Sequence, residues 1–318
     1  MKNKVLFITA AIMLAFVLAV CDIGGGNSGG DGNSGGNNSG GNNSGDGSNG
    51  GGNSGGGGNS GGGNSGGGDN SGNQGEILDP ATQTTKLTGG TTYTSNSSGN
   101  KSLPNSPYGY EMWTEGGNNN KLIWYGPDQG GGAAFRAEWN NPNDFLGRVG
   151  YFWNNGGKYT TYGDLFCGFN YTRSGRSTAG NYSYIGIYGW SRNPLIEYYI
   201  VEDWFGNQWQ ADTSPMGTAT TGGTVKGSYT LDGATYQVIQ NKRENKPSIN
   251  GTATFDQYFS VRQTPRKSGT ISITEHFKKW ESLGMKLGSS MYEVKFLVEA
   301  GGGTGWFDAS YLTFYQKD

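Results

Sequence analysis

Glu197 is the residue of this chain most clearly placed for chemistry. It lies in an aromatic and aliphatic segment, where alternation puts Leu195, Glu197, Tyr199 and Val201 on one face of an extended strand. A glutamate among such neighbours loses hydration, so it needs hydrogen-bond partners to stay charged, and tyrosine hydroxyls can supply them. A carboxylate held in this way can attack or activate a substrate, whereas on an exposed strand it would only be solvated.

A second apolar segment ends in another glutamate. Glu299 follows Phe296, Leu297 and Val298 and enters a run of glycines, where desolvation would raise its pKa and let it hold a proton near neutral pH. Glu293 has the same strand parity, so the pattern alone does not choose between the two. Two carboxyl groups, one to attack and one to protonate the leaving oxygen, are what hydrolysis of a glycosidic bond commonly needs.

The sequence offers few of the residues that other kinds of catalysis or binding would need. His276 is the only histidine, which leaves little for a Ser-His-Asp triad or a histidine-rich zinc site, and no metal site is expected. Glycines 130–132 precede no predicted helix and are read as a turn rather than a phosphate loop. The formal net charge is −2, and no Lys/Arg run interleaves with aromatic residues, so no nucleic-acid partner is expected.

The composition divides the chain into three parts. Residues 1–21 have Lys2 and Lys4 before an apolar run and are read as an export signal that ends at Cys21. The letters LAVC resemble a bacterial lipobox, which implies lipidation of Cys21; an ordinary signal peptide or an uncleaved anchor is the alternative. Residues 22–75, almost wholly Gly, Asn and Ser, predict a disordered tether, and residues 76–318 are long enough for one folded domain.

The folded part predicts an all-β domain. Short alternating segments are separated by Gly, Asn, Pro and Asp turns, and only one segment reads as a helix, with Thr274 as its cap and Glu275 in its first turn. Many strands with one helix indicate a sandwich of two sheets. Cys167, the one cysteine in this part, is expected to be a buried small hydrophobe. The expected strands are residues 121–125, 133–139, 183–188, 197–202, 228–231, 235–240 and 255–262.

Several collinear motifs in this part resemble glycoside hydrolase family 11, the compact endo-β-1,4-xylanases. YGWSRNPLIEYYIVEDW, residues 188–204, resembles the strand pair that carries the family's nucleophile, which matches Glu197. KPSINGTATFDQYFSVR, residues 246–262, resembles its thumb hairpin, and residues 268–288 resemble the strand and helix that follow. MYEVKFLVEAGGG, residues 291–303, resembles the strand of the acid/base, which matches Glu299. Residues 108–115 and 133–151 resemble the first strands.

The resemblance implies a jelly roll of two curved antiparallel sheets forming a cleft, with a single α-helix. It implies retaining, double-displacement hydrolysis of internal bonds in xylan, with no cofactor, because the two carboxyl groups complete the reaction unaided. The implied substrate-binding residues are Trp113, Tyr184, Tyr188 and Tyr199 in the cleft and Arg243, Pro247, Ile249 and Gln257 in the thumb and its base.

The chain departs from the family pattern at several positions. Ala300 follows Glu299 where the family commonly has Gly and an aromatic residue, and Phe259 and Tyr151 replace two tryptophans. Asp144 matches the position beside the acid/base where the family carries Asn or Asp. Two carboxyl groups in contact share a proton and titrate as a unit, so Asp144 predicts a mildly acidic pH optimum, with a solvated turn residue as the alternative.

Two other functions remain open at this stage. A non-catalytic polysaccharide-binding jelly roll on the cell envelope would use the same aromatic residues, and a structural surface lipoprotein would use the tether. The paired glutamates favour the enzyme. The expected location is the bacterial cell envelope or the extracellular space, with membrane contact only through a lipidated Cys21, and the expected state is a monomer.

Overall fold

The structure, a computed structural model, describes residues 78–99, 107–176, 182–205 and 223–317. Contacts divide the chain into Met1–Gln74 and Gly75–Asp318, and all described residues belong to the second unit. The expected export signal, tether and Cys21 lie outside the described residues. No helix among the residues described is long and apolar enough to cross a membrane.

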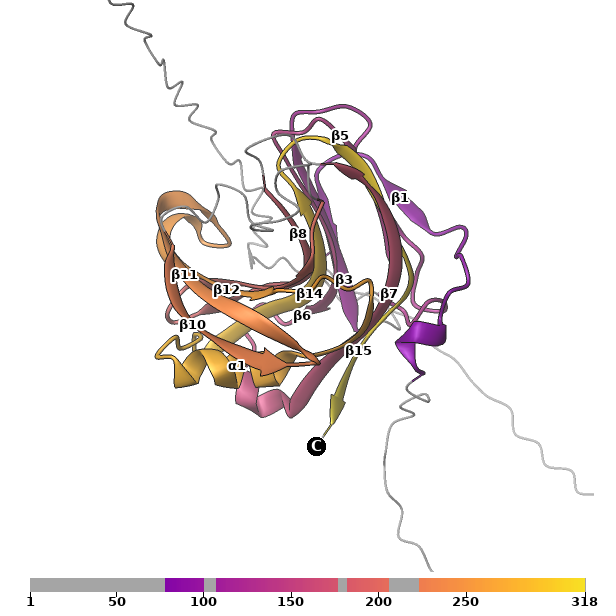
Figure 1. The fold of residues 1–318 in the computed structure, drawn as a ribbon. Helices are drawn as coiled ribbons and strands as arrows, with labels where there is room; N and C mark the ends of the chain where they lie inside the picture. Colours follow the sequence, from indigo (N-terminus) through magenta and orange to yellow (C-terminus); the bar gives the residue numbers. More distant parts are fainter. Residues whose placement is uncertain (1–77, 100–106, 177–181, 206–222, 318) are drawn as a thin grey trace, which may run out of the picture. The chain divides into compact units, whose positions relative to one another are not determined.

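Two β-sheets make up the second unit (Figure 1). The six-stranded sheet has the order β1 (Thr91–Tyr93), β4 (Lys121–Trp124), β5 (Phe135–Asn140), β15 (Thr304–Lys317), β7 (Asp164–Arg176) and β13 (Ser268–Ser272). The nine-stranded sheet has the order β10 (Thr224–Leu231), β11 (Ala234–Ser248), β12 (Gly251–Arg262), β9 (Ile196–Asp203), β8 (Ser183–Arg192), β14 (Ser290–Ala300), β6 (Asp144–Phe152), β3 (Tyr108–Glu115) and β2 (Ser97–Gly99). This architecture confirms the predicted all-β sandwich.

One strand pair differs from the predicted antiparallel sheets. β9 and β12 run parallel, with Glu197 opposite Gln257, while the other strand pairs described are antiparallel. The chain forms β10 and β11 between these two strands, so it returns to the edge of β9 in the same direction. This crossover places Gln257 beside Glu197 although the two residues are 60 positions apart.

The two faces of the nine-stranded sheet belong to two different hydrophobic clusters. On β14 the residues Val294, Phe296 and Val298 belong to the main hydrophobic core. Leu297 alternates with them and belongs to a second cluster built from Tyr184, Tyr188, Trp190, Tyr199 and Phe259. Because strand side chains alternate between faces, Glu197 and Glu299 lie on the side of this second cluster, which we call the aromatic face.

The main core also holds Cys167, which is free and buried. Burial raises the pKa of its thiol well above the usual value, because desolvation disfavours the thiolate. The thiol therefore stays protonated and packs as a small apolar group, as the sequence predicts.

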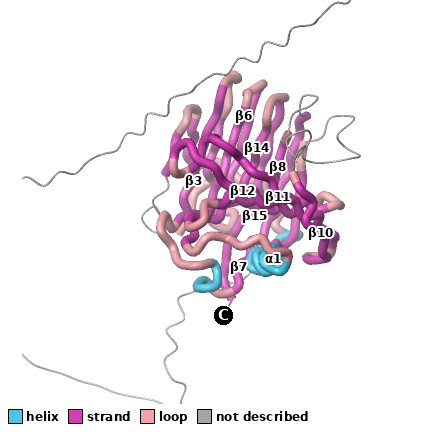
Figure 2. The backbone as a smooth tube through the Cα atoms, turned by 90° about the vertical axis from the view of Figure 1, so that its left-hand side faces the viewer, coloured by secondary structure: helices cyan, strands magenta, loops and turns pink. Residues whose placement is uncertain are grey.

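The α-helix α1 (Ile273–Ser282) packs against β7 and β10 and is drawn in cyan in Figure 2. Phe277 and Trp280 are fully buried, and Glu275 lies in the first turn, as predicted. The predicted cap is wrong: Ser272 holds the N-cap position and Thr274 lies inside the first turn. The Thr274 hydroxyl instead accepts a hydrogen bond from the backbone N–H of Leu165 at 2.8 Å, a tertiary contact that the local pattern does not reveal.

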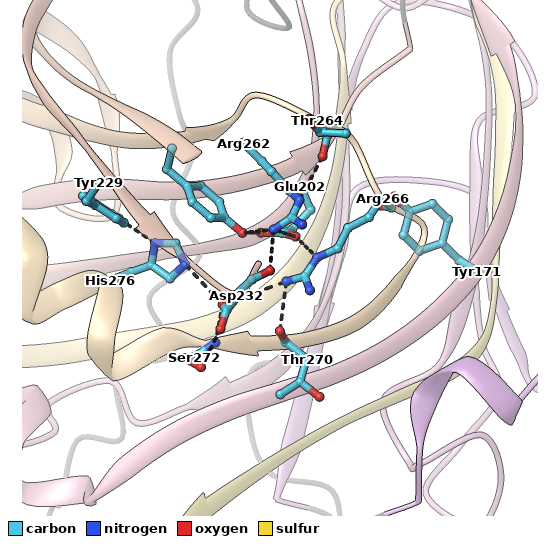
Figure 3. Close-up of polar contacts among 11 residues, drawn as sticks. Tyr171, Glu202, Tyr229, Asp232, Arg262, Thr264, Arg266, Thr270, Ser272 and His276 are labelled. Carbon is cyan, nitrogen blue, oxygen red and sulfur yellow. Dashed lines mark hydrogen bonds and ion pairs between the residues drawn. The ribbon is translucent and has the colours of Figure 1, made fainter. Parts of the chain in front are cut away.

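A buried polar cluster ties the helix to the nine-stranded sheet (Figure 3). Glu202 is fully buried, accepts hydrogen bonds from Tyr236 and Arg266, and lies 3.9 Å from Arg262. Asp232 accepts from Ser272, and its carboxylate lies 3.6 Å from Nε2 of His276. Hydrogen bonds and the ring of His276 hold the pKa of Asp232 below its usual value, so its contribution to stability is present at neutral pH and is lost as pH falls through that lowered pKa.

We expect Glu202→Gln to destabilise the fold by about 3–5 kcal/mol, because it leaves buried Arg262 and partly buried Arg266 without their shared carboxylate. Denaturant unfolding at pH 7 measures the change. The matched control is Glu275→Gln, which removes an exposed ion pair with Lys278 and should cost at most about 0.5 kcal/mol. Equal midpoints for the two variants would show that the buried cluster does not stabilise the domain.

Candidate active site

Glu197 lies on β9 and is held by three hydrogen-bond donors. The Tyr188 and Tyr199 hydroxyls donate to its Oε1 at 2.9 and 3.0 Å, and Nε2 of Gln257 donates to its Oε2 at 2.6 Å. Both oxygens of this buried carboxylate are therefore satisfied without a charged partner in direct contact. The predicted tyrosine donors are present, and the amide of Gln257 is added by the parallel strand β12.

The environment of Glu197 acts on its pKa in two directions. Desolvation raises the pKa above the usual value, while the hydrogen bonds from Gln257, Tyr188 and Tyr199 and the charge of Arg243 oppose the rise. Donors that stabilise the ionised form keep a carboxylate available for attack and hold its orientation. This is the arrangement expected of a nucleophile.

Glu299 on β14 has a different environment. It is 5% exposed, and its Oε2 has no hydrogen-bond partner among the described residues. Desolvation raises its pKa well above the usual value, and the negative charges of Asp144 and Glu197 add to the rise. A carboxyl group that keeps its proton beside an ionised one is suited to act as a general acid.

The two glutamates interact electrostatically across the aromatic face. In the strand register, the backbone of Glu197 lies opposite Trp190 of β8. The backbone of Glu299 lies opposite Tyr184, at the other end of the same strand. Their backbones are therefore at different levels of the sheet, yet the charge of Glu197 acts on the pKa of Glu299. Glu293 pairs with Lys295 at 2.7 Å and is fully buried, which makes it a partner in an ion pair rather than the acid/base.

Asp144 lies at the start of β6, close to Glu299. Burial raises its pKa to about 7, opposed by a hydrogen bond from Tyr182 and reinforced by the charges of Glu115 and Glu197. Its charge in turn raises the pKa of Glu299, so the two carboxyl groups titrate together. Asp144 thus begins a strand rather than lying in a solvated turn, and its effect on the pH optimum stays a prediction.

Tyr182 is a site residue that the sequence reasoning missed. Its ring stacks on Tyr184 with centroids 5.4 Å apart, and it also lies against Gly301, where an added Cβ would come within 2.8 Å of the ring. Gly301 is two residues after Glu299, so Tyr182 occupies space beside the segment that lacks the family's usual aromatic residue. In the sequence, only its position just before an aromatic strand indicates that Tyr182 could belong to the site.

The aromatic face surrounds the two glutamates with rings. Tyr199 stacks on Phe259 with centroids 4.6 Å apart, and its edge contacts Tyr188 and Tyr184 at 4.9 and 5.2 Å. Trp113 lies on β3 and is partly exposed. Apolar faces of sugar rings stack on such surfaces, so these side chains are suited to bind a polysaccharide.

The β11–β12 hairpin contributes the remaining predicted residues. Figure 1 shows its far end curling back over the nine-stranded sheet. Pro247 is exposed and Ile249 partly buried near the turn, while Gln257 is at the base and accepts a hydrogen bond from Asn241. Arg243 acts electrostatically on Glu197.

An arginine that the sequence reasoning did not select also contacts this hairpin. Arg192 on β8 donates to the side chain of Asn250 at the hairpin turn and to the backbone of Asn154. It thereby connects the hairpin turn to the loop after β6.

The described residues offer no group of three or more His, Cys, Asp or Glu side chains that could hold a metal ion. Residues 205–227, a segment whose length in the sequence exceeds that of its counterpart in the family pattern, lie mostly outside the described residues.

Comparison with known proteins defines the class. The family model for glycosyl hydrolases family 11 matches residues 105–310, and the chain belongs to this family. A crystal structure of a mutant ENZbleach xylanase has 68% sequence identity and a TM-score of 0.72, covering 76% of this chain and 93% of that one. The jelly-roll fold expected from the sequence is thereby confirmed.

Curated relatives share the same domain. Endo-1,4-beta-xylanase C of Fibrobacter succinogenes is 47% identical over 222 residues, which cover 70% of this chain and 34% of that protein. Endo-1,4-beta-xylanase S20 of Neocallimastix patriciarum is 44% identical over 241 residues, which cover 76% of this chain and 67% of that protein. The match thus spans about a third of the length of the first of these relatives and two thirds of the second.

Proposed function

We propose that this protein is an endo-β-1,4-xylanase that hydrolyses internal bonds of xylan with retention of configuration. The observation that carries the proposal is that the two carboxyl groups on the aromatic face differ in hydrogen bonding and in the pKa shift that their surroundings cause. Three donors stabilise the ionised form of Glu197, whereas desolvation and neighbouring charge raise the pKa of Glu299 well above its usual value. This pair, in a chain of family 11, favours an enzyme over a non-catalytic binding module.

The mechanism follows from these roles. The Glu197 carboxylate attacks the anomeric carbon while Glu299 donates its proton to the leaving oxygen, and a covalent glycosyl-enzyme forms. Glu299, now ionised, removes a proton from water, whose oxygen attacks the same carbon and releases Glu197. Two inversions at one carbon give net retention. Trp113, Tyr184, Tyr188, Tyr199, Arg243, Pro247, Ile249 and Gln257 are proposed to bind and orient the xylan chain.

Hydrolysis of soluble xylan tests the activity. Internal cleavage lowers viscosity much faster than it releases reducing ends, whereas cleavage from chain ends does the reverse. A protein that binds xylan without releasing reducing sugar would instead be the binding module. Glu275→Gln, an exposed helix substitution, serves as the active control.

Asp144→Asn tests the proposed pH tuning. If Asp144 and Glu299 share a proton, the acidic limb and the optimum should move upward by about one pH unit, equivalent to a coupling of about 1.4 kcal/mol. Charge repulsion alone predicts that the pH–rate profile moves in the opposite direction. Loss of the Asp144 charge would lower the pKa of Glu299 and so move the basic limb to lower pH. The pH–rate profile distinguishes the two, and an unchanged profile would show that Asp144 does not tune the acid/base.

We also propose that Cys21 is lipidated and that residues 22–75 serve as a tether from the cell envelope. The support is the pair of N-terminal lysines, the apolar run, LAVC and the Gly/Asn/Ser composition. Mass spectrometry of the mature N-terminus tests it, and an unmodified N-terminus elsewhere in the chain would contradict it. The proposed state is a monomer, which light scattering of the purified protein measures.

A further inference from the structure

Four charged residues lie beside the proposed catalytic pair on the aromatic face. They are Glu111 on β3, Arg148 on β6, and Glu293 and Lys295 on β14, which we call the charge cluster. Arg148 is 5% exposed, and Glu293 and Lys295 are fully buried. Burying charge is costly unless the charges are paired, so the arrangement of this cluster requires a physical account.

The charges of the cluster alternate in sign. Nη2 of Arg148 donates to Oε2 of Glu111 at 2.6 Å and lies 3.4 Å from Oε1 of Glu293. Nζ of Lys295 lies 2.7 Å from the other oxygen of Glu293 and 3.9 Å from Glu111. Two carboxylates on different strands therefore hold the guanidinium of Arg148 in one place.

From that place Arg148 contacts a residue that supports the nucleophile. Its guanidinium carbon lies 4.5 Å from the centroid of the Tyr188 ring, within the range of a cation–π contact. The Tyr188 hydroxyl donates to Glu197 at 2.9 Å and accepts a hydrogen bond from the indole of Trp190. A continuous series of contacts thus runs from the charge cluster through Arg148 and Tyr188 to Glu197.

We propose that Arg148 is a positioning residue for the proposed hydrolysis. Held by Glu111 and Glu293, it fixes the Tyr188 ring so that the hydroxyl points at Glu197, and its positive charge offsets part of the negative charge of the two catalytic glutamates. This inference rests on the proposed function and adds a role for a charged residue that does not reach the reacting atoms.

The charge of Arg148 should shift the pKa of Glu299 in one direction only. The charge of Arg148 lowers the pKa of Glu299 and so opposes the larger effects of desolvation, Asp144 and Glu197. Loss of that charge should therefore move the basic limb of the pH–rate profile upward. Other titratable or charged groups that interact electrostatically with Glu299 or Arg148 are Glu111 on β3, Asp144 on β6, Tyr182 before β8, Tyr184 and Tyr188 on β8, Glu197 and Tyr199 on β9, and Tyr292, Glu293 and Lys295 on β14.

Three variants separate positioning from structural support. Arg148→Met removes the charge and the cation–π contact, and it should lower kcat between about two- and thirtyfold, the equivalent of a lost cation–π contact, with KM nearly unchanged and the basic limb moved upward. Arg148→Lys keeps the charge without the planar group, so it should restore the basic limb and only part of kcat.

Glu111→Gln provides the opposite change. It leaves Arg148 beside Glu293 but removes one neutralising carboxylate, so the effective positive charge near Glu299 grows and the basic limb should move downward. Because Glu111 is partly exposed, with 23% of its side chain accessible, this variant is expected to fold even if Arg148→Met does not. Circular dichroism and unfolding midpoints check that every variant is folded.

The measurement is the pH–rate profile of kcat and KM on xylan for the wild type, the three variants and the Glu275→Gln control. Opposite displacements of the basic limb in Arg148→Met and Glu111→Gln support the proposal. Equal losses of kcat with unchanged profiles would assign Arg148 a structural role and overturn it, as would wild-type kinetics in both variants. If the folded wild type released no sugar from xylan, the proposed function itself would be wrong.

Discussion

Glu197→Gln should lower xylan hydrolysis by about 10⁴-fold or more, because the amide keeps the shape of the side chain but cannot form the glycosyl-enzyme. The three donors around Glu197 explain why the loss should be chemical rather than structural. An uncharged amide removes a buried charge, so the fold should keep its stability while the reaction loses its first step. Initial rates on soluble xylan and the unfolding midpoint measure the two quantities.

The matched control for this prediction is Gln257→Glu, which places a second carboxyl group at the other end of the same hydrogen bond. It keeps the nucleophile but replaces its donor, so kcat should fall less than in Glu197→Gln and the acidic limb should move upward. Substantial turnover by Glu197→Gln, free of wild-type contamination, would remove Glu197 from the mechanism.

Glu299→Gln should lower the rate on xylan by about 10²–10⁴-fold, the usual contribution of general acid–base catalysis. The size of the loss should depend on the leaving group. An aryl xylobioside with an acidic phenol needs little protonation, so formation of the glycosyl-enzyme should stay fast while its hydrolysis slows. A rapid burst of phenol followed by slow turnover is the expected result.

The basic limb of the pH–rate profile should also disappear in Glu299→Gln, because the group that must hold a proton is gone. Glu293→Gln is the comparison on the same face of β14, six residues before Glu299. It disrupts the ion pair with Lys295 and should affect stability more than the leaving-group dependence. If Glu293→Gln showed the burst and Glu299→Gln did not, the acid/base assignment would be reversed.

The alternation of side chains predicted much of this site. Leu195, Glu197, Tyr199 and Val201 were placed on one face by period alone, and Tyr199 does donate to Glu197. Local patterns also predicted the single helix and the place of Glu275 in its first turn. These features depend on neighbours within a few positions, which a sequence displays directly.

Features that depend on distant strands were not predictable in the same way. Gln257 reaches Glu197 through the parallel pair β9–β12, and the choice of Glu299 over Glu293 depended on the resemblance to a family rather than on strand parity. Arg148 pairs with Glu111 from 37 positions away, and nothing in the pattern of either strand marks that ion pair. Thr274 bonds the backbone of β7, which a local capping rule cannot anticipate.

The stereochemistry of the first product tests the central claim most directly. Proton NMR of a short xylo-oligosaccharide digest, recorded before mutarotation, shows whether the new reducing end is the β or the α anomer. Attack by Glu197 followed by attack by water predicts the β anomer, the configuration of the bond that was cleaved. Initial formation of the α anomer would mean that water attacks directly, and it would contradict the assignment of Glu197 as a nucleophile.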